Sequence, residues 1–200
     1  MMQNKRILGI TGGSGCGKTT VSHILRELGI YVIDGDLVAR LVAVPGGPCL
    51  KELAACFGTQ ILRTDGSLDR KLLGNIVFSD PGQLQQLNRI THRYITNWIM
   101  EDLKKREEKL CAIDAAALLE SGLGKGCDWV LSVLAKPRLR IERIIKRDGL
   151  NGEEAQKRIS AQQPDEFYIE KSDFIIYNNG NEGDLRKQLE QVLREIEGNR

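Results

Sequence analysis

The chain has 200 residues, a formal net charge of +2 and a hydrophobic fraction of 41%. This length allows one α/β domain with a substantial core, and the near balance of charge argues against a nucleic-acid-binding or membrane-binding surface. No apolar run approaches the roughly 18 residues of a membrane span, and residues 1–6 do not resemble a signal peptide. Five cysteines without a Cys-x-x-Cys pair indicate reduced thiols, so we expect a cytoplasmic protein without a disulfide framework or a zinc site.

A glycine-rich stretch follows the first predicted strand, Arg6–Thr11. It reads GGSGCGKT over residues 12–19, fits the pattern Gly, four residues, Gly-Lys-Ser/Thr, and precedes apolar residues at helical spacing. Strand, glycine loop and helix together predict a phosphate-binding loop for a nucleoside triphosphate, because glycines let successive N–H groups converge on a phosphate. Lys18 is expected to reach the β- and γ-phosphates, and Thr19 to hold Mg²⁺. The residues expected to contact the nucleotide are Gly13, Ser14, Gly15, Cys16, Gly17, Lys18, Thr19 and Thr20.

A second predicted strand, residues 29–33, ends at Asp34-Gly35-Asp36, and a short helix is expected over residues 37–42. In a parallel sheet, ligands bind at the edge formed by the carboxyl ends of the strands. Asp36 is therefore a candidate for orienting or deprotonating a hydroxyl that receives a phosphoryl group. It is equally a candidate N-cap of the following helix, a contact worth about 1 kcal/mol. The spacing alone does not separate the two roles.

Residues 43–108 show helical patterns and few strand signals. One helix is expected to end at Gly58, and a long helix is expected to begin at Pro81. We predict that this block is a helical insertion that receives the second substrate. His92 on the long helix is a candidate for facing that substrate, whereas His23 is expected to be an ordinary surface or packing residue.

Three further strands are predicted over residues 110–114, 128–134 and 172–177, and a closing amphipathic helix over residues 182–197. The first of these strands ends at Asp114. A carboxylate in this position is either part of the magnesium shell or a structural residue at a strand end.

Two polar helices are expected before the last strand, over residues 138–147 and 152–162. Arg140, Arg143 and Arg147 are spaced three and four apart, so they share one face of the first helix. In a phosphate-handling protein such a face can close over ATP as a lid. The alternative is a solvated basic surface.

These motifs together resemble the dephospho-CoA kinase family, and the resemblance runs from Ile7 to about Leu185. It rests on the phosphate loop, on the Asp-x-Asp sequence with Arg40, on Leu-Asp-Arg at 68–70 and on Arg-x-x-x-Arg-Asp-Gly-Leu at 143–150. The chain departs from the family at 116–120, where it has Ala-Ala-Leu-Leu-Glu for Pro-Leu-Leu-Phe-Glu, and at Arg93, where proline is usual.

The resemblance implies a role for each matching site residue. Asp36 acts on the acceptor hydroxyl, Arg143 and Arg147 are lid arginines, Asn178 flanks the adenine of ATP, and Arg40 and His92 meet the acceptor. Arg140 matches no family position and is therefore left out of the predicted lid.

The resemblance also implies a fold and a reaction. The expected architecture is an α/β P-loop kinase fold, a parallel five-stranded sheet flanked by helices, with a helical substrate-binding insertion and a helical lid. The expected boundaries are a core of about 1–42, 109–135 and 172–200, an insertion of about 43–108 and a lid of about 136–171. The expected reaction is Mg²⁺-dependent transfer of the γ-phosphoryl of ATP to the ribose 3′-hydroxyl of dephospho-CoA, giving coenzyme A and ADP.

The sequence is compatible with two other functions. The first is a P-loop kinase for another small molecule, such as a nucleoside or nucleotide. The second is a GTP-dependent switch, which is disfavoured because the last strand ends in Tyr-Asn-Asn-Gly at 177–180 and not in Asn-Lys-x-Asp. We expect no nucleic-acid or membrane partner and a monomer or weak oligomer.

Overall fold

The computed structural model describes residues 5–198. The expectation that the chain does not start with a signal peptide concerns residues 1–4 in part, and these lie outside the described residues. The chain divides into two compact units. The first contains the residues up to Ile33 and from Glu108 onward, and the second is Asp34–Glu107. The second unit thus begins earlier in the chain than the insertion expected from the sequence.

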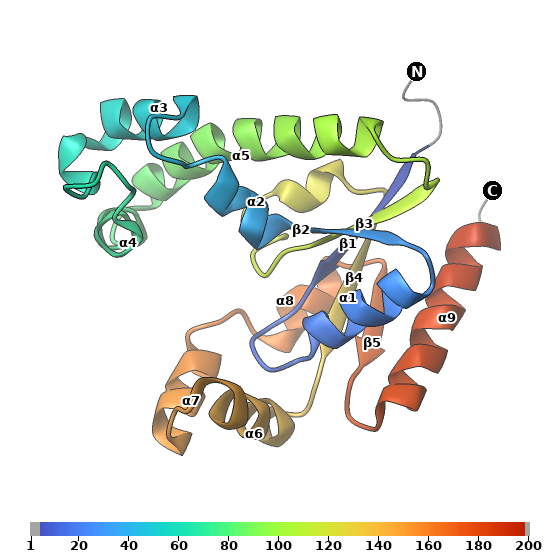
Figure 1. The fold of residues 1–200 in the computed structure, drawn as a ribbon. Coiled ribbons are helices and arrows are strands. Elements are labelled where there is room, and N and C mark those ends of the chain that lie inside the picture. Colours follow the sequence, from blue (N-terminus) through green and yellow to red (C-terminus); the bar gives the residue numbers. More distant parts are fainter. Residues whose placement is uncertain (1–4, 199–200) are drawn as a thin grey trace. The chain divides into compact units, whose positions relative to one another are not determined.

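A five-stranded parallel sheet forms the centre of the first unit, with the strand order β2-β3-β1-β4-β5 (Figure 1). Its apolar strands are buried on both faces, as a parallel sheet covered by helices requires. β1 lies in the middle of the sheet, paired with β3 and β4, so the glycine loop follows the central strand. The predicted sheet is confirmed. The strands are β1 (Arg6–Thr11), β2 (Tyr31–Asp34), β3 (Leu110–Asp114), β4 (Trp129–Leu134) and β5 (Phe174–Tyr177).

Helices α1 (Lys18–Glu27) and α9 (Glu182–Gly198) pack against each other and share one core with the sheet (Figure 1). That core contains fully buried side chains from β1, β4 and both helices. Burying one such leucine or isoleucine contributes about 1.5–3 kcal/mol, so this core fixes the helix that carries Lys18.

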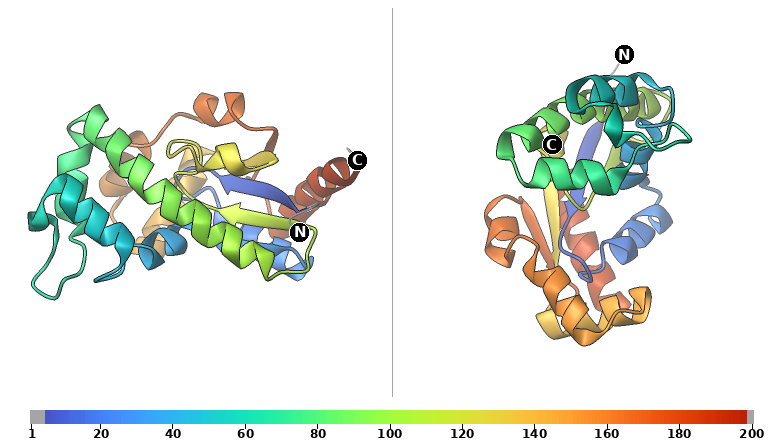
Figure 2. Two further views of the ribbon diagram at one scale, coloured as in Figure 1. Left: turned by 90° about the horizontal axis from the view of Figure 1, so that it is seen from above. Right: turned by 90° about the vertical axis from the view of Figure 1, so that its left-hand side faces the viewer.

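Helices α6 (Pro137–Asp148) and α7 (Gly152–Ser160) follow β4 and pack against each other (Figure 2). Asn151 begins α7 with a capping box, in which its side chain and that of Glu154 each accept from the other's backbone N–H. A short helix, α8 (Asp165–Glu170), then contacts β4. The sequence did not predict α8.

The second unit is helical, as expected (Figure 2). Helices α2, α3 and α4 each pack against α5, and the apolar faces of α3, α4 and α5 enclose a separate core. Within residues 5–198, no helix is both long enough and apolar enough to cross a membrane. The helices of this unit are α2 (Gly35–Leu41), α3 (Pro48–Phe57), α4 (Arg70–Phe78) and α5 (Pro81–Lys104), with a short 3₁₀ turn at Thr59–Ile61.

Candidate active site

The phosphate-binding loop connects β1 to α1. Gly17 is the N-cap of α1 with a φ of 98°, and a Cβ there would lie 2.0 Å from Asn178 Nδ2. Only glycine fits this position, and glycine has no side chain to cap the first amides of the helix. Because the first N–H groups of a helix have no partner within it, they are available to an anion, and the helix dipole favours one.

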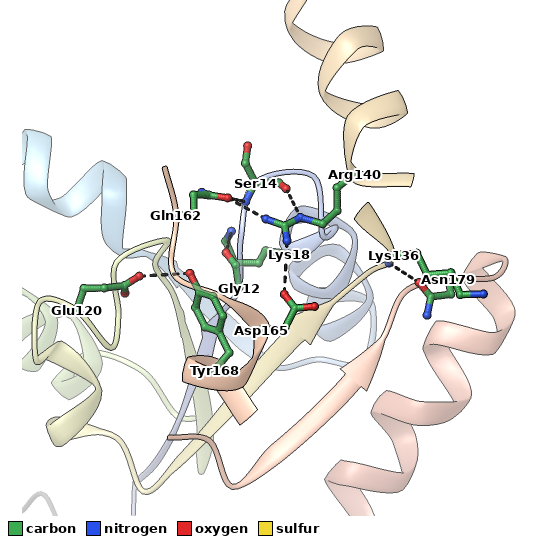
Figure 3. A network of polar contacts seen from close by, with 10 residues as sticks. All are labelled: Gly12, Ser14, Lys18, Glu120, Lys136, Arg140, Gln162, Asp165, Tyr168 and Asn179. Atoms are coloured by element: carbon green, nitrogen blue, oxygen red, sulfur yellow. Dashed lines mark hydrogen bonds and ion pairs between the residues drawn. The ribbon is translucent and has the colours of Figure 1, made fainter. Parts of the chain in front are cut away.

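Lys18 and Thr19 are the first two residues of α1. The Lys18 ammonium group donates to Gly12 O over 2.6 Å, so it folds back over the loop (Figure 3). Thr19 is exposed, and its hydroxyl presents the oxygen donor that Mg²⁺ prefers. Mg²⁺ takes few ligands from protein and the rest from phosphates and water, so one hydroxyl beside a phosphate-binding loop fits this ion.

Asp114, at the end of β3, has a structural partner. Its carboxylate accepts a 2.6 Å hydrogen bond from the hydroxyl of Ser22, which is buried on α1. This contact joins the end of β3 to the helix that carries Lys18 and Thr19. Asp114 therefore supports the loop through α1, and the proposed metal ligands do not include it.

Three successive carbonyl groups of the loop each accept a hydrogen bond from a side chain elsewhere in the chain. These bonds hold the carbonyls of residues 14–16, and two of the three donors lie on α6. Arg140 Nε donates to Ser14 O over 3.1 Å, Arg143 Nη1 to Gly15 O over 3.2 Å, and Asn178 Nδ2 to Cys16 O over 2.9 Å.

Arg140 and Arg143 of α6 thus face the phosphate loop. Arg140 is only 4% exposed, and Arg143 is half-buried and also donates to the backbone and side-chain oxygens of Asn178. A solvated basic surface therefore does not describe these two residues. The backbone N–H of Lys136 donates to Asn179 Oδ1 over 2.8 Å, which ties the start of α6 to the end of β5 (Figure 3).

Arg147 is the most exposed of the three. Its guanidinium group lies 3.5 Å from Ser14 Oγ and forms two hydrogen bonds with Asp148. The Arg147 guanidinium lowers the pKa of the Asp148 carboxyl, and Arg158, 2.5 Å away, acts in the same direction. Asp148 therefore favours its ionised form, and its carboxylate orients the Arg147 side chain beside Ser14.

Cys16 belongs to the core and is fully buried. Burial raises the pKa of its thiol, although Arg140 and Lys18 act in the opposite direction. The neutral thiol packs in the core of the first unit, and both backbone groups of Cys16 bond within the protein. All five cysteines lie within the described residues and are free thiols.

Asp34, and not Asp36, caps helix α2. Asp34 Oδ1 accepts from Leu37 N over 2.8 Å, and α2 starts at Gly35. The alternative interpretation of Asp36 as the N-cap is therefore wrong, because the helix begins two residues earlier than its apolar pattern indicates. Asp36 lies in the first turn of α2 with its side chain exposed.

The other two predicted acceptor-binding residues also belong to the second unit. Arg40 lies in the last turn of α2 and is exposed. His92 lies midway along α5, where its Nε2 is buried without a hydrogen-bond partner among the described residues. The neighbouring Arg93, which departs from the family pattern, is held by Glu52 and Tyr94. The predicted site residues are thus divided between the two units.

The buried imidazole of His92 should make stability depend on pH. Burial lowers the pKa of His92 from its ordinary value of 6.5, so the unfolded chain binds the proton first as pH falls. This disfavours the folded state progressively below about pH 6.5. In His92→Gln, the melting temperature should fall less between pH 7.5 and 5.5 than in the parent protein. Parallel slopes for the parent protein and His92→Gln would contradict the prediction.

The fold and the loop together define a class of protein. A glycine loop after the central strand of a parallel sheet, with a lysine and a threonine at the following helix start and arginines facing it, characterises the P-loop kinases. A sequence model of the dephospho-CoA kinase family matches residues 6–184. The chain belongs to this family of phosphotransferases.

Individual relatives agree with this assignment. A dephospho-CoA kinase from Anaeromyxobacter dehalogenans is 38% identical over 198 residues, which cover 98% of this chain and 94% of that protein. A solved dephospho-CoA kinase from Campylobacter jejuni is 30% identical, with a TM-score of 0.65 and coverage of 98% and 100%. The solved structure of TT1252 from Thermus thermophilus is 33% identical, with a TM-score of 0.82 and coverage of 96% and 98%.

Proposed function

We propose that this protein transfers the γ-phosphoryl group of ATP to the ribose 3′-hydroxyl of dephospho-CoA, giving coenzyme A and ADP. The observation that carries the proposal is a fully assembled phosphate-binding loop in a chain that matches the family over residues 6–184. In the reaction the bond between the γ-phosphorus and the β–γ bridging oxygen breaks, and a bond to the 3′-oxygen forms. The hydroxyl proton leaves to a base.

The nucleotide side of the proposal uses the first unit. The loop residues Gly13 to Thr20 surround the phosphates, with the N–H groups of Ser14, Cys16 and Thr20 already donating within the protein. Lys18 leaves Gly12 O to pair with the β- and γ-phosphates. Arg143 and Arg147 neutralise the charge that spreads over the transferring group. Asn178, whose side chain holds Cys16 O, has its proposed place beside the adenine.

Mg²⁺ belongs to the proposal because the Thr19 hydroxyl is a suitable oxygen ligand. When bound, the ion would be held by the Thr19 hydroxyl and would neutralise phosphate charge. The remaining work falls to the protein, which positions the two substrates and keeps the donors fixed.

The acceptor side uses the second unit. The exposed carboxylate of Asp36 orients the 3′-hydroxyl and accepts its proton as the phosphoryl group arrives. Because the side chain of Asp34 accepts the hydrogen bond from Leu37 N at the start of α2, Asp36 is not the N-cap of this helix. Arg40 and His92 contact dephospho-CoA in this proposal. The protein acts in the cytoplasm, in keeping with its free thiols.

A coupled assay of ADP release over a panel of acceptors tests the function. With Mg²⁺-ATP, dephospho-CoA should give a kcat/KM at least about 100-fold above adenosine, AMP or shikimate, because a site that binds polar groups of its substrate rejects molecules that lack them. Higher activity with a nucleoside or nucleotide would support the alternative kinase. GTP hydrolysis without acceptor-dependent ADP release would support the switch.

A further inference from the structure

Arg140 is a buried cation whose guanidinium group bonds three parts of the first unit. Its Nε donates to Ser14 O over 3.1 Å, and its Nη2 donates to Gln162 Oε1 over 2.9 Å. Its Nη1 lies 3.5 Å from Asp165 Oδ1 (Figure 3). The guanidinium therefore joins the phosphate loop to the segment after α7 and to the start of α8. A buried charge with this many directed bonds costs free energy when it is removed from its partners.

The side chain of Gln162 completes the contact. Its Oε1 also accepts from the backbone N–H of Ser14 over 2.8 Å. The N–H and the C=O of Ser14 are therefore both held, one by Gln162 and the other by Arg140, and these two side chains bond to each other (Figure 3). The backbone of Ser14 is therefore fixed on both sides, at its N–H group and at its carbonyl group.

Gly13 lies next to both side chains of this contact. A Cβ added to Gly13 would lie 2.3 Å from Arg140 Nη2 and 3.0 Å from Gln162 Oε1. The guanidinium thus lies directly against the loop backbone, and the absence of a side chain at Gly13 is what admits it. Arg140 and Gln162 therefore contact two neighbouring loop residues, Gly13 and Ser14.

We propose that Arg140 and Gln162 form one positioning unit that holds the phosphate loop in its nucleotide-binding conformation. Neither residue is assigned a contact with the reacting atoms. Their role is to fix the Ser14 peptides before ATP arrives, so that binding does not have to order the loop. The inference rests on the proposed use of ATP.

We expect substitution of these residues to weaken the binding of ATP and ADP without weakening the binding of dephospho-CoA. Arg140→Gln should weaken Mg²⁺-ATP and Mg²⁺-ADP binding in calorimetry about tenfold, the scale of one lost hydrogen bond to a charged group. The KM for ATP should rise to a similar extent, while the KM for dephospho-CoA stays at the parent value. Arg140→Lys should not restore binding, because an ammonium group cannot reproduce the fork of donors.

Gln162→Ala keeps the test decisive if Arg140→Gln does not fold, because Gln162 lies only partly buried in an irregular segment. It should show the same selective loss of nucleotide binding. In the double variant the loss should be no larger than in the worse single variant, because residues that act as one unit are not additive. The matched controls are Arg138→Gln, at an exposed residue of α6, and Gln163→Ala, at the exposed neighbour of Gln162.

The outcomes separate this inference from the proposed function. If the parent and both controls do not bind ATP, the proposed function fails. If they bind it and Gln162→Ala binds equally well, the positioning unit is refuted. Equal rises in both KM values, or fully additive losses in the double variant, would also overturn it.

Discussion

Lys18→Ala should lower kcat by on the order of 100-fold or more in a protein that remains folded. Lys18 bonds to Gly12 O in this structure, and its ammonium group is the cation of the loop that reaches the transferring phosphate in our proposal. A charge-assisted contact that strengthens as the γ-phosphoryl group departs contributes more to the transition state than to ATP binding. The melting temperature should change little, because the lost contact is a single bond to a backbone carbonyl.

The measurement is steady-state ADP release together with thermal unfolding on the same preparation. Lys136→Ala is a suitable control, because Lys136 contacts Asn179 through its backbone N–H and its own side chain is exposed. That variant should retain the parent kcat. A folded Lys18→Ala protein with a kcat near that of the parent would rule out the assignment of Lys18.

Asp36→Asn should also lower kcat by about 100-fold or more, with ATP binding and melting temperature close to the parent values. Asparagine keeps the shape of the side chain but removes its negative charge and its basicity, which the transfer step needs. Loss of capping does not contribute, because the cap of α2 is Asp34.

The stability control for this experiment is Asp34→Ala. It removes the side-chain oxygen that accepts from Leu37 N, so it should cost about 1 kcal/mol of folding free energy. Asp36→Asn should not show that loss. Full activity in Asp36→Asn would refute the proposed mechanism even if the nucleotide-side predictions hold.

The sequence was sufficient for the sheet and most helices because their signals are local. Apolar runs mark β1 and β3, and Pro81 after Asp80 marks the start of α5. Helix ends were less well determined. Periodicity places the start of α2 near Leu37, whereas the structure starts the helix at Gly35. Because of this shift the N-cap is Asp34, and Asp36 lies in the first turn of the helix.

Contacts between distant segments were the part that the sequence did not reveal. The spacing of the α6 arginines places Arg140 on the same face as Arg143, but Arg140 matches no family position, so the sequence does not assign it to the lid. Its bonds to Ser14 and Gln162 depend on how α6, α7 and the loop pack together. α8 was missed for a related reason, because six residues carry too little periodicity to identify a helix without its contact with β4.

The three held carbonyls of the loop have an electronic consequence. Each carbonyl shares a peptide group with the N–H of the next residue, so the bonds to the carbonyls of residues 14–16 act on the N–H groups of Gly15, Cys16 and Gly17. A cation at a carbonyl oxygen withdraws electron density from the peptide group and makes its N–H a stronger donor. Arg140 thereby extends part of its positive charge through the backbone to the N–H of Gly15 in the proposed phosphate site, although its guanidinium group is itself buried. Arg143 acts on the N–H of Cys16, which donates to Gly13 O over 3.3 Å, and so strengthens a bond within the loop.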